Sequence, residues 1–369
     1  MREAHSWIFV MASHSTALNN LCTCLRGTLP ERVDWVALIG LANETLTTPA
    51  LIDLVSRFDR EIPEDVCAYV RDIYQRNLAR NDRLAAQLEE TVVAINARGV
   101  RPVLLKGAAI LTTAAAPRRG TRLMADLDIL VAPDQVEATL DALAGAGYET
   151  HFETAAHEEK WYVELKRQRD VGMIDLHRSA PGPAYFYRAS GQILQHCALI
   201  SVGRGSAYVP SATYKALMLI IHDQFQDSGY WIGDLDLRHL LELRDLANSQ
   251  EGIDWDQLAS FVSGKLARNA VESQLVALAV LLGVDVPVGM RSRLIPRLQF
   301  RRRLTQARFP ITRWPLLMTA VLDYPNYRKG PGAEYRTASP LLGRSWAIPK
   351  FSSLRFILGL ASNHRAGKV

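Results

Sequence analysis

The sequence predicts an α+β fold in which a small core that contains β-strands lies between two helix-rich regions. Three short apolar runs, at 103–105, 126–131 and 171–177, have the length and alternation of β-strands. The segments on either side instead repeat apolar residues at helical spacing. The expected organisation is an N-terminal helical region at 1–98, an α/β core at 99–180 and a C-terminal helical domain at 181–369.

The N-terminal region opens with apolar clusters at 33–41 and 51–58, which favour short helices. Pro63 and the two acids after it are typical of a helix start, because proline fits the first turn and acids complement the positive end of the helix dipole. Helical spacing then continues to Gly99. A stretch of that length exceeds the usual helix, so the pattern predicts one long helix or a break near 76–81.

The core begins with a strand that ends at Lys106, where a helix is expected to follow. Pro133 marks the start of another helix, which is expected to reach Ala144. Two further strands are expected near 151–154 and 160–166.

The C-terminal region follows a Pro-Gly-Pro turn at 181–183, which marks the exit from the core. Apolar residues between 214 and 225 form a helical stripe. The Asp-x-Asp segments at 234–236 and 254–256 are predicted to be helix starts, where acids complement the helix dipole. The basic run at 291–303 favours a solvated helix face, with contact to an acidic acceptor or a membrane surface as the alternative.

The most informative feature is a third Asp-x-Asp segment, Asp126 and Asp128, because it lies in a strand-like run. Residues i and i+2 of a strand face the same side and lie roughly 6–7 Å apart. Two such carboxylates can hold one hard cation or bracket two, and a bound metal relieves their repulsion. The spacing alone is also compatible with a solvated strand edge.

The surrounding motifs give this pair a family context. In chain order they are Leu105-Lys106-Gly107, Arg122, the Asp-Leu-Asp-Ile-Leu-Val run at 126–131, and a helix that ends near Gly145-Ala146-Gly147-Tyr148. Together they resemble the polymerase-β-like nucleotidyltransferase superfamily and, within it, the uncharacterised bacterial nucleotidyltransferase family. The resemblance is strongest over 99–180, weakens towards 283, and implies a polymerase-β-like core with a small mixed sheet. The Gly-Ser that is usual in the superfamily is Gly107-Ala108 here, so no hydroxyl is available at that place for a phosphate oxygen.

The resemblance implies a metal-dependent transfer of NMP from an NTP, with ATP as the expected donor, to a hydroxyl or phosphate of an acceptor. Asp175 lies on the strand expected at 171–177 and is the candidate for the third acid that faces the pair. By this resemblance Asp126, Asp128 and Asp175 are the catalytic residues that hold two Mg²⁺ ions, and Asp175 also helps to take the acceptor's proton.

Other residues are assigned around these acids. Lys106 and Arg122 match positions on the phosphate side, and Gly107 permits close backbone approach where the helix begins. His177 is expected to orient a carboxylate or the acceptor, or else to be a half-buried residue at a strand end. His222 is expected to pack against a neighbouring helix or to reach the acceptor side of the cleft.

Composition narrows the partners. The net charge of +5, with 35 Arg against 8 Lys, suits an anionic substrate such as an NTP and does not demand nucleic acid. Four scattered cysteines without metal-type pairs favour free thiols in a reducing cytoplasm, and the apolar run at 7–11 is too short for a membrane span.

The acceptor is not specified by the sequence. A modified peptide or small metabolite is expected from the biosynthetic gene sets in which relatives occur, and a protein acceptor is a further option. The alternative is a nucleotide-binding or scaffold protein without transfer activity. Three acids favour the enzyme, because binding alone does not require a paired metal site.

Overall fold

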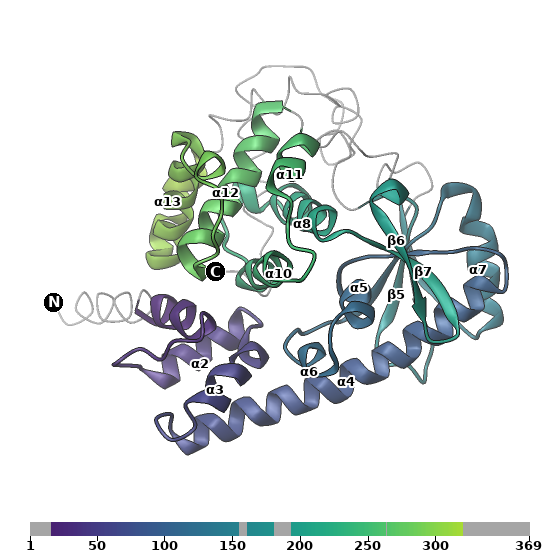
Figure 1. Cartoon of the computed structure of the whole chain (residues 1–369), viewed down its shortest axis with the longest axis horizontal. Helices are drawn as coiled ribbons and strands as arrows, with labels where there is room; N and C mark the ends of the chain where they lie inside the picture. Colours follow the sequence, from purple (N-terminus) through teal and green to yellow (C-terminus); the bar gives the residue numbers. More distant parts are fainter. Residues whose placement is uncertain (1–15, 155–160, 181–192, 263, 320–369) are drawn as a thin grey trace. The chain divides into compact units, whose positions relative to one another are not determined.

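The structure is a computed structural model that describes residues 16–154, 161–180, 193–262 and 264–319 (Figure 1). The chain forms two compact units. Among the described residues, one unit, the helical unit, comprises 16–46, 216–262 and 264–319, and the other, the sheet unit, comprises 47–154, 161–180 and 193–215. The turn expected at 181–183 lies outside the described residues.

The sheet unit contains a mixed sheet of seven strands in the order β3-β4-β5-β2-β1-β7-β6. The pairs β2–β5 and β1–β7 are parallel, and the other neighbours are antiparallel. The strands are β1 (Val103–Leu104), β2 (Asp126–Leu130), β3 (Glu149–Glu153), β4 (Tyr162–Lys166), β5 (Met173–His177), β6 (Cys197–Val202) and β7 (Gly205–Pro210). The expected α+β class with a small mixed sheet is confirmed.

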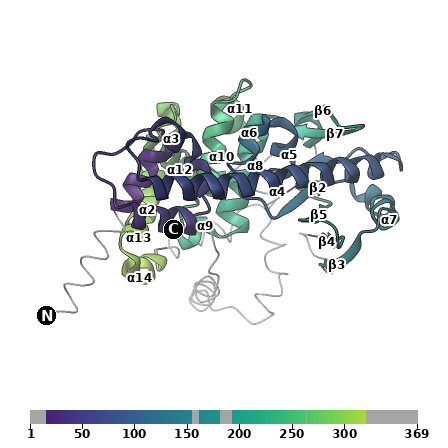
Figure 2. The same cartoon turned by 90° about the horizontal axis from the view of Figure 1, so that it is seen from below.

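Helices complete this unit. They are α3 (Ile52–Arg57), α4 (Glu64–Asn96), α5 (Lys106–Thr113), α6 (Ala116–Arg119) and α7 (Val136–Gly145), with short 3₁₀ turns at Thr48–Leu51, Pro133–Gln135 and Ile193–His196. The 33 residues of α4 form one unbroken helix, so the break considered near 76–81 does not occur (Figure 2).

The core of the sheet unit lies between α4, α7 and one face of the sheet. Leu88 and Val92 of α4 are fully buried there with Leu127 and Ile129 of β2. Each such side chain contributes on the order of 1.5–3 kcal/mol through burial. Because neighbouring strand residues point to opposite faces, this packing directs the acids of β2 and β5 to the other face of the sheet.

The β6–β7 hairpin adds two strands from a region that was expected to be helical. β7 pairs with β1, and α4 packs against β7, so both segments belong to the sheet unit. The boundaries expected at 98 and 180 therefore divide elements that pack together, because strand pairing and helix docking join residues far apart in the sequence.

The helical unit contains helices of which α12 packs against α10 and α13, and α13 against α14 (Figure 1). They are α2 (Trp35–Glu44), α9 (Gly229–Ile232), α10 (Leu237–Ala247), α11 (Trp255–Phe261), α12 (Gly264–Leu282), α13 (Leu294–Arg308) and α14 (Arg313–Leu317), and α8 (Ala212–Ile221) leads into this unit. Asp236 and Asp254 are the N-caps of α10 and α11, which confirms the helix starts predicted at these acids.

The basic run is only partly a solvated face. Arg301 is exposed, but Arg302 is mostly buried and Arg303 is completely buried within α13. Arg303 donates to the side-chain oxygens of Gln224 and Gln274. The prediction of a solvated face is therefore wrong at these two positions, and amide side chains in the core accept hydrogen bonds from both terminal nitrogens of Arg303.

Two smaller expectations concern thiols and membranes. All four cysteines are free, as their scattered spacing predicts. Among the described helices, none combines the length and the apolar character that a bilayer crossing requires.

Candidate functional site

Parallel pairing of β2 and β5 brings the predicted acids together. Asp128 lies opposite Asp175 in the register, and Asp126 lies opposite Met173. Neighbouring residues in register point to the same side of a sheet, so Asp126, Asp128 and Asp175 share the face opposite the hydrophobic core. Asp128 is almost completely buried, whereas Asp126 and Asp175 are partly exposed.

Lys106 makes the closest contact with these acids. Its Nζ atom lies 2.6 Å from Oδ1 of Asp128, and the Leu105 N–H donates to the Asp128 carbonyl at 3.0 Å. The backbone of Lys106 has a φ of +39°, in the left-handed region that costs a residue with a side chain about 1–2 kcal/mol. This backbone turn between β1 and α5 places the ammonium group of Lys106 at the carboxylate.

His177 is the second partner of Asp128. Its Nε2 atom lies 3.2 Å from the same Oδ1 atom, and its side chain is nearly buried. His177 follows Asp175 by two residues on β5, so both side chains point to the face that carries Asp128. Contact with a carboxylate is one of the two roles expected for this histidine.

The partners of Asp128 control its ionisation. Burial favours the neutral acid, but Lys106 and His177 outweigh it and hold the pKa of Asp128 well below its usual range. Burial also opposes the charge of Lys106, and Asp128, Asp126 and Asp175 together keep its pKa above the ordinary value. Asp128 and Lys106 are therefore an ionised pair at neutral pH.

Asp175 is the acid whose charge is poorly compensated. Burial, followed by the charges of Asp126 and Asp128, raises its pKa from 3.8 to about 7, and Lys106 offsets only part of this effect. A carboxyl group that titrates near neutrality is typical of functional sites.

The charge of Asp175 predicts a pH-dependent stability effect in metal-free protein. Its folded pKa is raised, so the folded state holds a proton between about pH 3.8 and 7 that the unfolded chain releases, and stability falls across that range. Asp175→Asn should therefore raise the free energy of unfolding at about pH 8, by on the order of 1–2 kcal/mol after allowance for partial exposure. The melting temperature measured in a chelator should rise with it.

The same substitution should have almost no effect near pH 4, where the carboxyl group is neutral in both states. Differential scanning calorimetry of both proteins at the two pH values measures the difference. An equal shift at both pH values would show that the substitution acts through packing instead of charge.

Three side chains of this face offer converging ligand atoms. One nitrogen or oxygen atom from each of Asp128, Asp175 and His177 lies within 4.8 Å of the other two. Carboxylate and imidazole are common ligands of divalent cations. After burial, the charges of Asp126 and Asp128 raise the pKa of Asp175, and a bound cation would offset this repulsion. Asp126 is outside this group of three, although its charge contributes to the pKa shifts of Lys106 and Asp175.

Gly107 and Arg122 lie against each other beside the pair. A Cβ atom on Gly107 would come within 2.8 Å of both Nη1 of Arg122 and Sδ of Met124. The glycine thus makes room for the guanidinium next to the start of α5. The structure brings Lys106, Gly107 and Arg122 to one end of the sheet, where they were expected to meet a triphosphate.

Polar side chains of α4 support the loops that lead into β2 and β5, and sequence reasoning missed them. Arg80 donates to the carbonyls of Met124 and, at 2.9 Å, Val171. Asn77 and Asn81 each donate to the carbonyl of Arg122, at 2.8 and 2.9 Å. Their signal was the placement of asparagines on the apolar face of a helix. They hold the segments immediately before Asp126 and Asp175.

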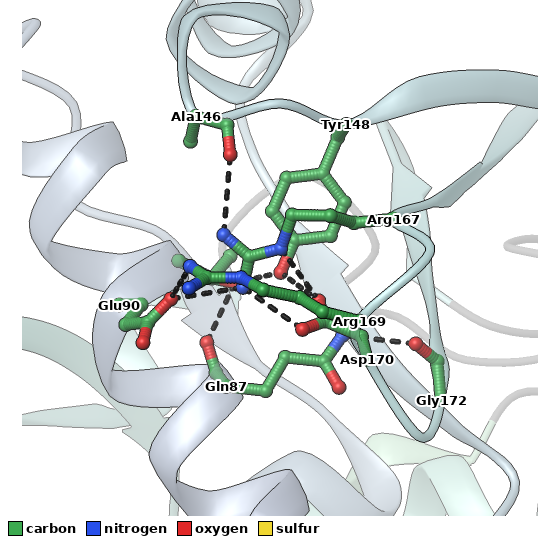
Figure 3. Close-up of polar contacts among 9 residues, drawn as sticks. Gln87, Glu90, Ala146, Tyr148, Arg167, Arg169, Asp170 and Gly172 are labelled. Carbon is green, nitrogen blue, oxygen red and sulfur yellow. Dashed lines mark hydrogen bonds and ion pairs between the residues drawn. The ribbon is translucent and has the colours of Figure 1, made fainter.

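The turn between β4 and β5 is anchored to α4 as well (Figure 3). Arg167 donates to both carboxylate oxygens of Asp170 at 3.0 Å and to Glu90 at 2.9 Å, and Tyr148 donates to Asp170 at 2.7 Å. Gln87 donates to the Gly172 carbonyl at 2.9 Å. Buried, charge-assisted contacts of this kind fix the start of β5, the strand that carries Asp175.

His222 belongs to the helical unit and begins the π-helical turn His222–Gln226. Its Nδ1 atom lies 3.5 Å from Asp227, and its ring packs edge-on against the ring of His239. The contact with a histidine of α10 corresponds to the packing role expected for His222. Its acceptor-side role stays a prediction.

Comparison with known proteins gives one match. A family model described as "Uncharacterised nucleotidyltransferase" matches residues 31–283, which is more than half of the chain. The matched range includes α4, the whole sheet and the cluster around Asp128. No curated protein and no solved structure matches the chain.

Proposed function

The chain belongs to the uncharacterised nucleotidyltransferase family, and on this premise we propose that it moves the NMP of an NTP, with ATP as donor, onto a hydroxyl or phosphate of an acceptor. The acceptor class that we propose is a peptide or a small metabolite. The observation that carries the proposal is the register of β2 and β5, which sets Asp128 beside Asp175 with Lys106 and His177 in contact with Asp128.

The acids of this face would hold Mg²⁺. The proposed ligands are Asp126, Asp128 and Asp175, and the approach of carboxylate oxygens of Asp128 and Asp175 to within 4.8 Å supports a cation at this place. When bound, Mg²⁺ supplies charge neutralisation for the triphosphate and the leaving pyrophosphate.

The remaining steps belong to side chains of the chain itself. Lys106 and Arg122 place two positively charged side chains at the end of the sheet where phosphate oxygens would bind. Asp175 accepts the proton of the acceptor hydroxyl, because its partly exposed carboxyl group lies beside Asp128 on the same face. His177 orients Asp128 through the contact of its Nε2 atom.

One observation favours a different function, a nucleotide-binding or scaffold protein without transfer activity. Ala108 follows Gly107 and is fully buried, so this position offers no hydroxyl to a phosphate oxygen. A binding protein would take up Mg²⁺ and NTP but would never release pyrophosphate.

A labelling screen distinguishes the two functions and identifies the acceptor. The purified protein is incubated with Mg²⁺, each of the four NTPs labelled at the α-phosphorus, and a lysate of the organism that carries the gene. We expect label from one NTP to enter a peptide or small molecule. Binding of Mg²⁺ and NTP without label transfer to any acceptor would favour the scaffold protein.

Two substitutions test the phosphate side of the site. Lys106→Ala and Arg122→Ala should each weaken NTP binding by about 1–3 kcal/mol, and should weaken NMP binding less, because they remove a charge-assisted contact with the phosphates. Isothermal titration with NTP and NMP measures both effects. Lys166→Ala and Arg101→Ala are matched controls, since both side chains are exposed in the same unit. Unchanged affinity in both test variants would remove these residues from the site.

A further inference from the structure

A second group of potential ligand atoms lies inside the helical unit. Asp223, Asp236 and His239 are all buried, with no more than 4% of each residue exposed. One ligand atom of each lies within 4.8 Å of the other two. The acids come from a π-helical turn and from the N-cap of α10, and His239 lies in the first turn of that helix.

Both carboxylates are held in place by contacts that involve one of their oxygens. Oδ1 of Asp236 accepts from the His239 N–H at 2.9 Å, and Oδ2 of Asp223 accepts from the side-chain amides of Gln224 and Gln274. The other oxygens, Oδ2 of Asp236 and Oδ1 of Asp223, lie 3.3 and 3.7 Å from Nδ1 of His239.

The backbone around Asp223 also restricts the position of its carboxylate. A π-helical turn inserts an extra residue into the helix, and such turns are frequent at functional sites. Gly229 packs directly on this turn, where a Cβ atom would come within 2.8 Å of the Asp223 carbonyl oxygen and 3.4–3.5 Å of its carboxylate oxygens. The tight packing fixes the Asp223 side chain towards α10.

The Nδ1 atom of His239 is the ligand atom that lies near both carboxylates. Its Nδ1 atom is buried, points at both carboxylates and makes no hydrogen bond of normal geometry with the described part of the chain. Separations of 3.3 and 3.7 Å are longer than the usual hydrogen bond of about 2.7–3.2 Å. Ligands about 2.0–2.2 Å from a tetrahedral zinc ion lie about 3.3–3.6 Å apart, so the 3.3 Å separation falls in this range and the 3.7 Å separation lies just above it.

We propose that Asp223, Asp236 and His239 form a second metal site, which binds a transition-metal dication of the Zn²⁺ type and ties the π turn to the start of α10. An imidazole with two carboxylates suits Zn²⁺ better than Mg²⁺, which prefers oxygen ligands and water. The burial of all three side chains makes the site structural. It is separate from the transfer reaction and lies in a different unit from Asp128.

The alternative to a bound metal is that His239 is protonated. Burial opposes the charge on His239, but Asp236 and Asp223 outweigh it and raise its pKa. A protonated His239 would then neutralise part of the cluster, with Arg303 contributing through Gln224 and Gln274. This account predicts no bound metal.

Metal content tests the proposal. The full chain is purified without chelator after growth with added Zn²⁺, and its metals are counted by mass spectrometry. We expect one Zn²⁺ per chain at this site. Asp236→Asn and His239→Asn should each lower it at least tenfold, while Asp128→Asn and Asp175→Asn should retain it. Loss in the last two variants with retention in the first two would assign the ion to the transfer site and overturn the proposal.

Asp254→Asn is the matched control. Asp254 caps α11 as Asp236 caps α10, by accepting from a backbone N–H at 2.9 Å, but it lies outside the cluster. Asparagine caps helices about as well as aspartate, so both variants keep the cap and only Asp236→Asn should lose metal. Equal metal content in the two variants would contradict the proposal.

A measurement on wild-type protein avoids the risk that a variant does not fold. In buffer that contains Mg²⁺ throughout, treatment with a Zn²⁺-selective chelator should lower the melting temperature, and Zn²⁺ should restore it. Co²⁺ bound in place of Zn²⁺ should show the visible absorption of a tetrahedral site. If Zn²⁺ leaves the melting temperature of the treated protein unchanged and Co²⁺ gives only the spectrum of the hydrated ion, the proton account holds.

Discussion

Asp128→Asn is expected to reduce nucleotidyl transfer by at least about 10³-fold, the largest loss that we predict for a single substitution. The amide keeps the shape of the side chain but cannot supply the charge that the proposed Mg²⁺ site requires. Metal ions contribute several kcal/mol to such reactions, and about 1.4 kcal/mol corresponds to a factor of ten in rate. Pyrophosphate release, measured with the acceptor found in the labelling screen, gives the ratio of rates.

The same substitution should also lower stability at neutral pH. Ionised Asp128 is stabilised by Lys106 and His177, so its contribution is present above the unfolded pKa and is lost as the pH falls. Asp141→Asn is the matched control, because Asp141 is an exposed acid of α7 in the same unit. Activity of Asp128→Asn within tenfold of wild type would refute the assignment of Asp128 to metal binding.

Asp175→Ala should separate binding from chemistry. Asp126 and Asp128 remain to hold Mg²⁺ and NTP, so affinity measured by titration should be largely retained. Turnover should fall by at least about 10²-fold, the lower end expected for the loss of a positioned general base. Its partly exposed position beside Asp128 in the register of β2 and β5 suits Asp175 to this role.

Glu164→Gln provides the comparison for Asp175→Ala. Glu164 lies opposite Asp175 in the register of β4 and β5, and it is the nearest alternative acid on a strand. We expect Glu164→Gln to turn over normally. If Asp175→Ala retains full activity and Glu164→Gln loses it, Glu164 takes the place of Asp175 as the base.

Local patterns were sufficient to predict the elements that carry the site. Alternation identified the strands of Asp126 and Asp128 and of Asp175, and the apolar run before Lys106 identified β1. The i, i+2 spacing predicted that Asp126 and Asp128 would share a face, as they do in β2. These features depend on neighbours in the sequence, which a single chain displays directly.

Pairing between distant segments could not be predicted in the same way. The same-face spacing of Asp126 and Asp128 predicted repulsion within that pair. The structure places the uncompensated charge on Asp175 instead, because Lys106 and His177 both contact Asp128. Only the cross-strand register and the backbone turn at Lys106 reveal this distribution.

The burial of polar side chains was the other feature that could not be predicted from the sequence. Arg303 was interpreted as part of a solvated run, and Asp236 only as a helix cap, although both are buried. The sequence does not show that the side-chain amides of Gln224 and Gln274 accept hydrogen bonds from Arg303, since they come from separate segments. The same is true of Arg80, whose partners, the backbone carbonyls of Met124 and Val171, lie far from it in the sequence.

The fate of the α-phosphorus tests the central proposal most directly. Wild-type protein is given Mg²⁺, the acceptor and ATP labelled at either the α- or the γ-phosphorus, and the labelled acceptor is counted. We predict that α-label enters the acceptor, that γ-label leaves as pyrophosphate, and that a chelator or Asp128→Asn stops both. Transfer of γ-label to the acceptor, or α-label transfer that persists in Asp128→Asn, would contradict nucleotidyl transfer at this site.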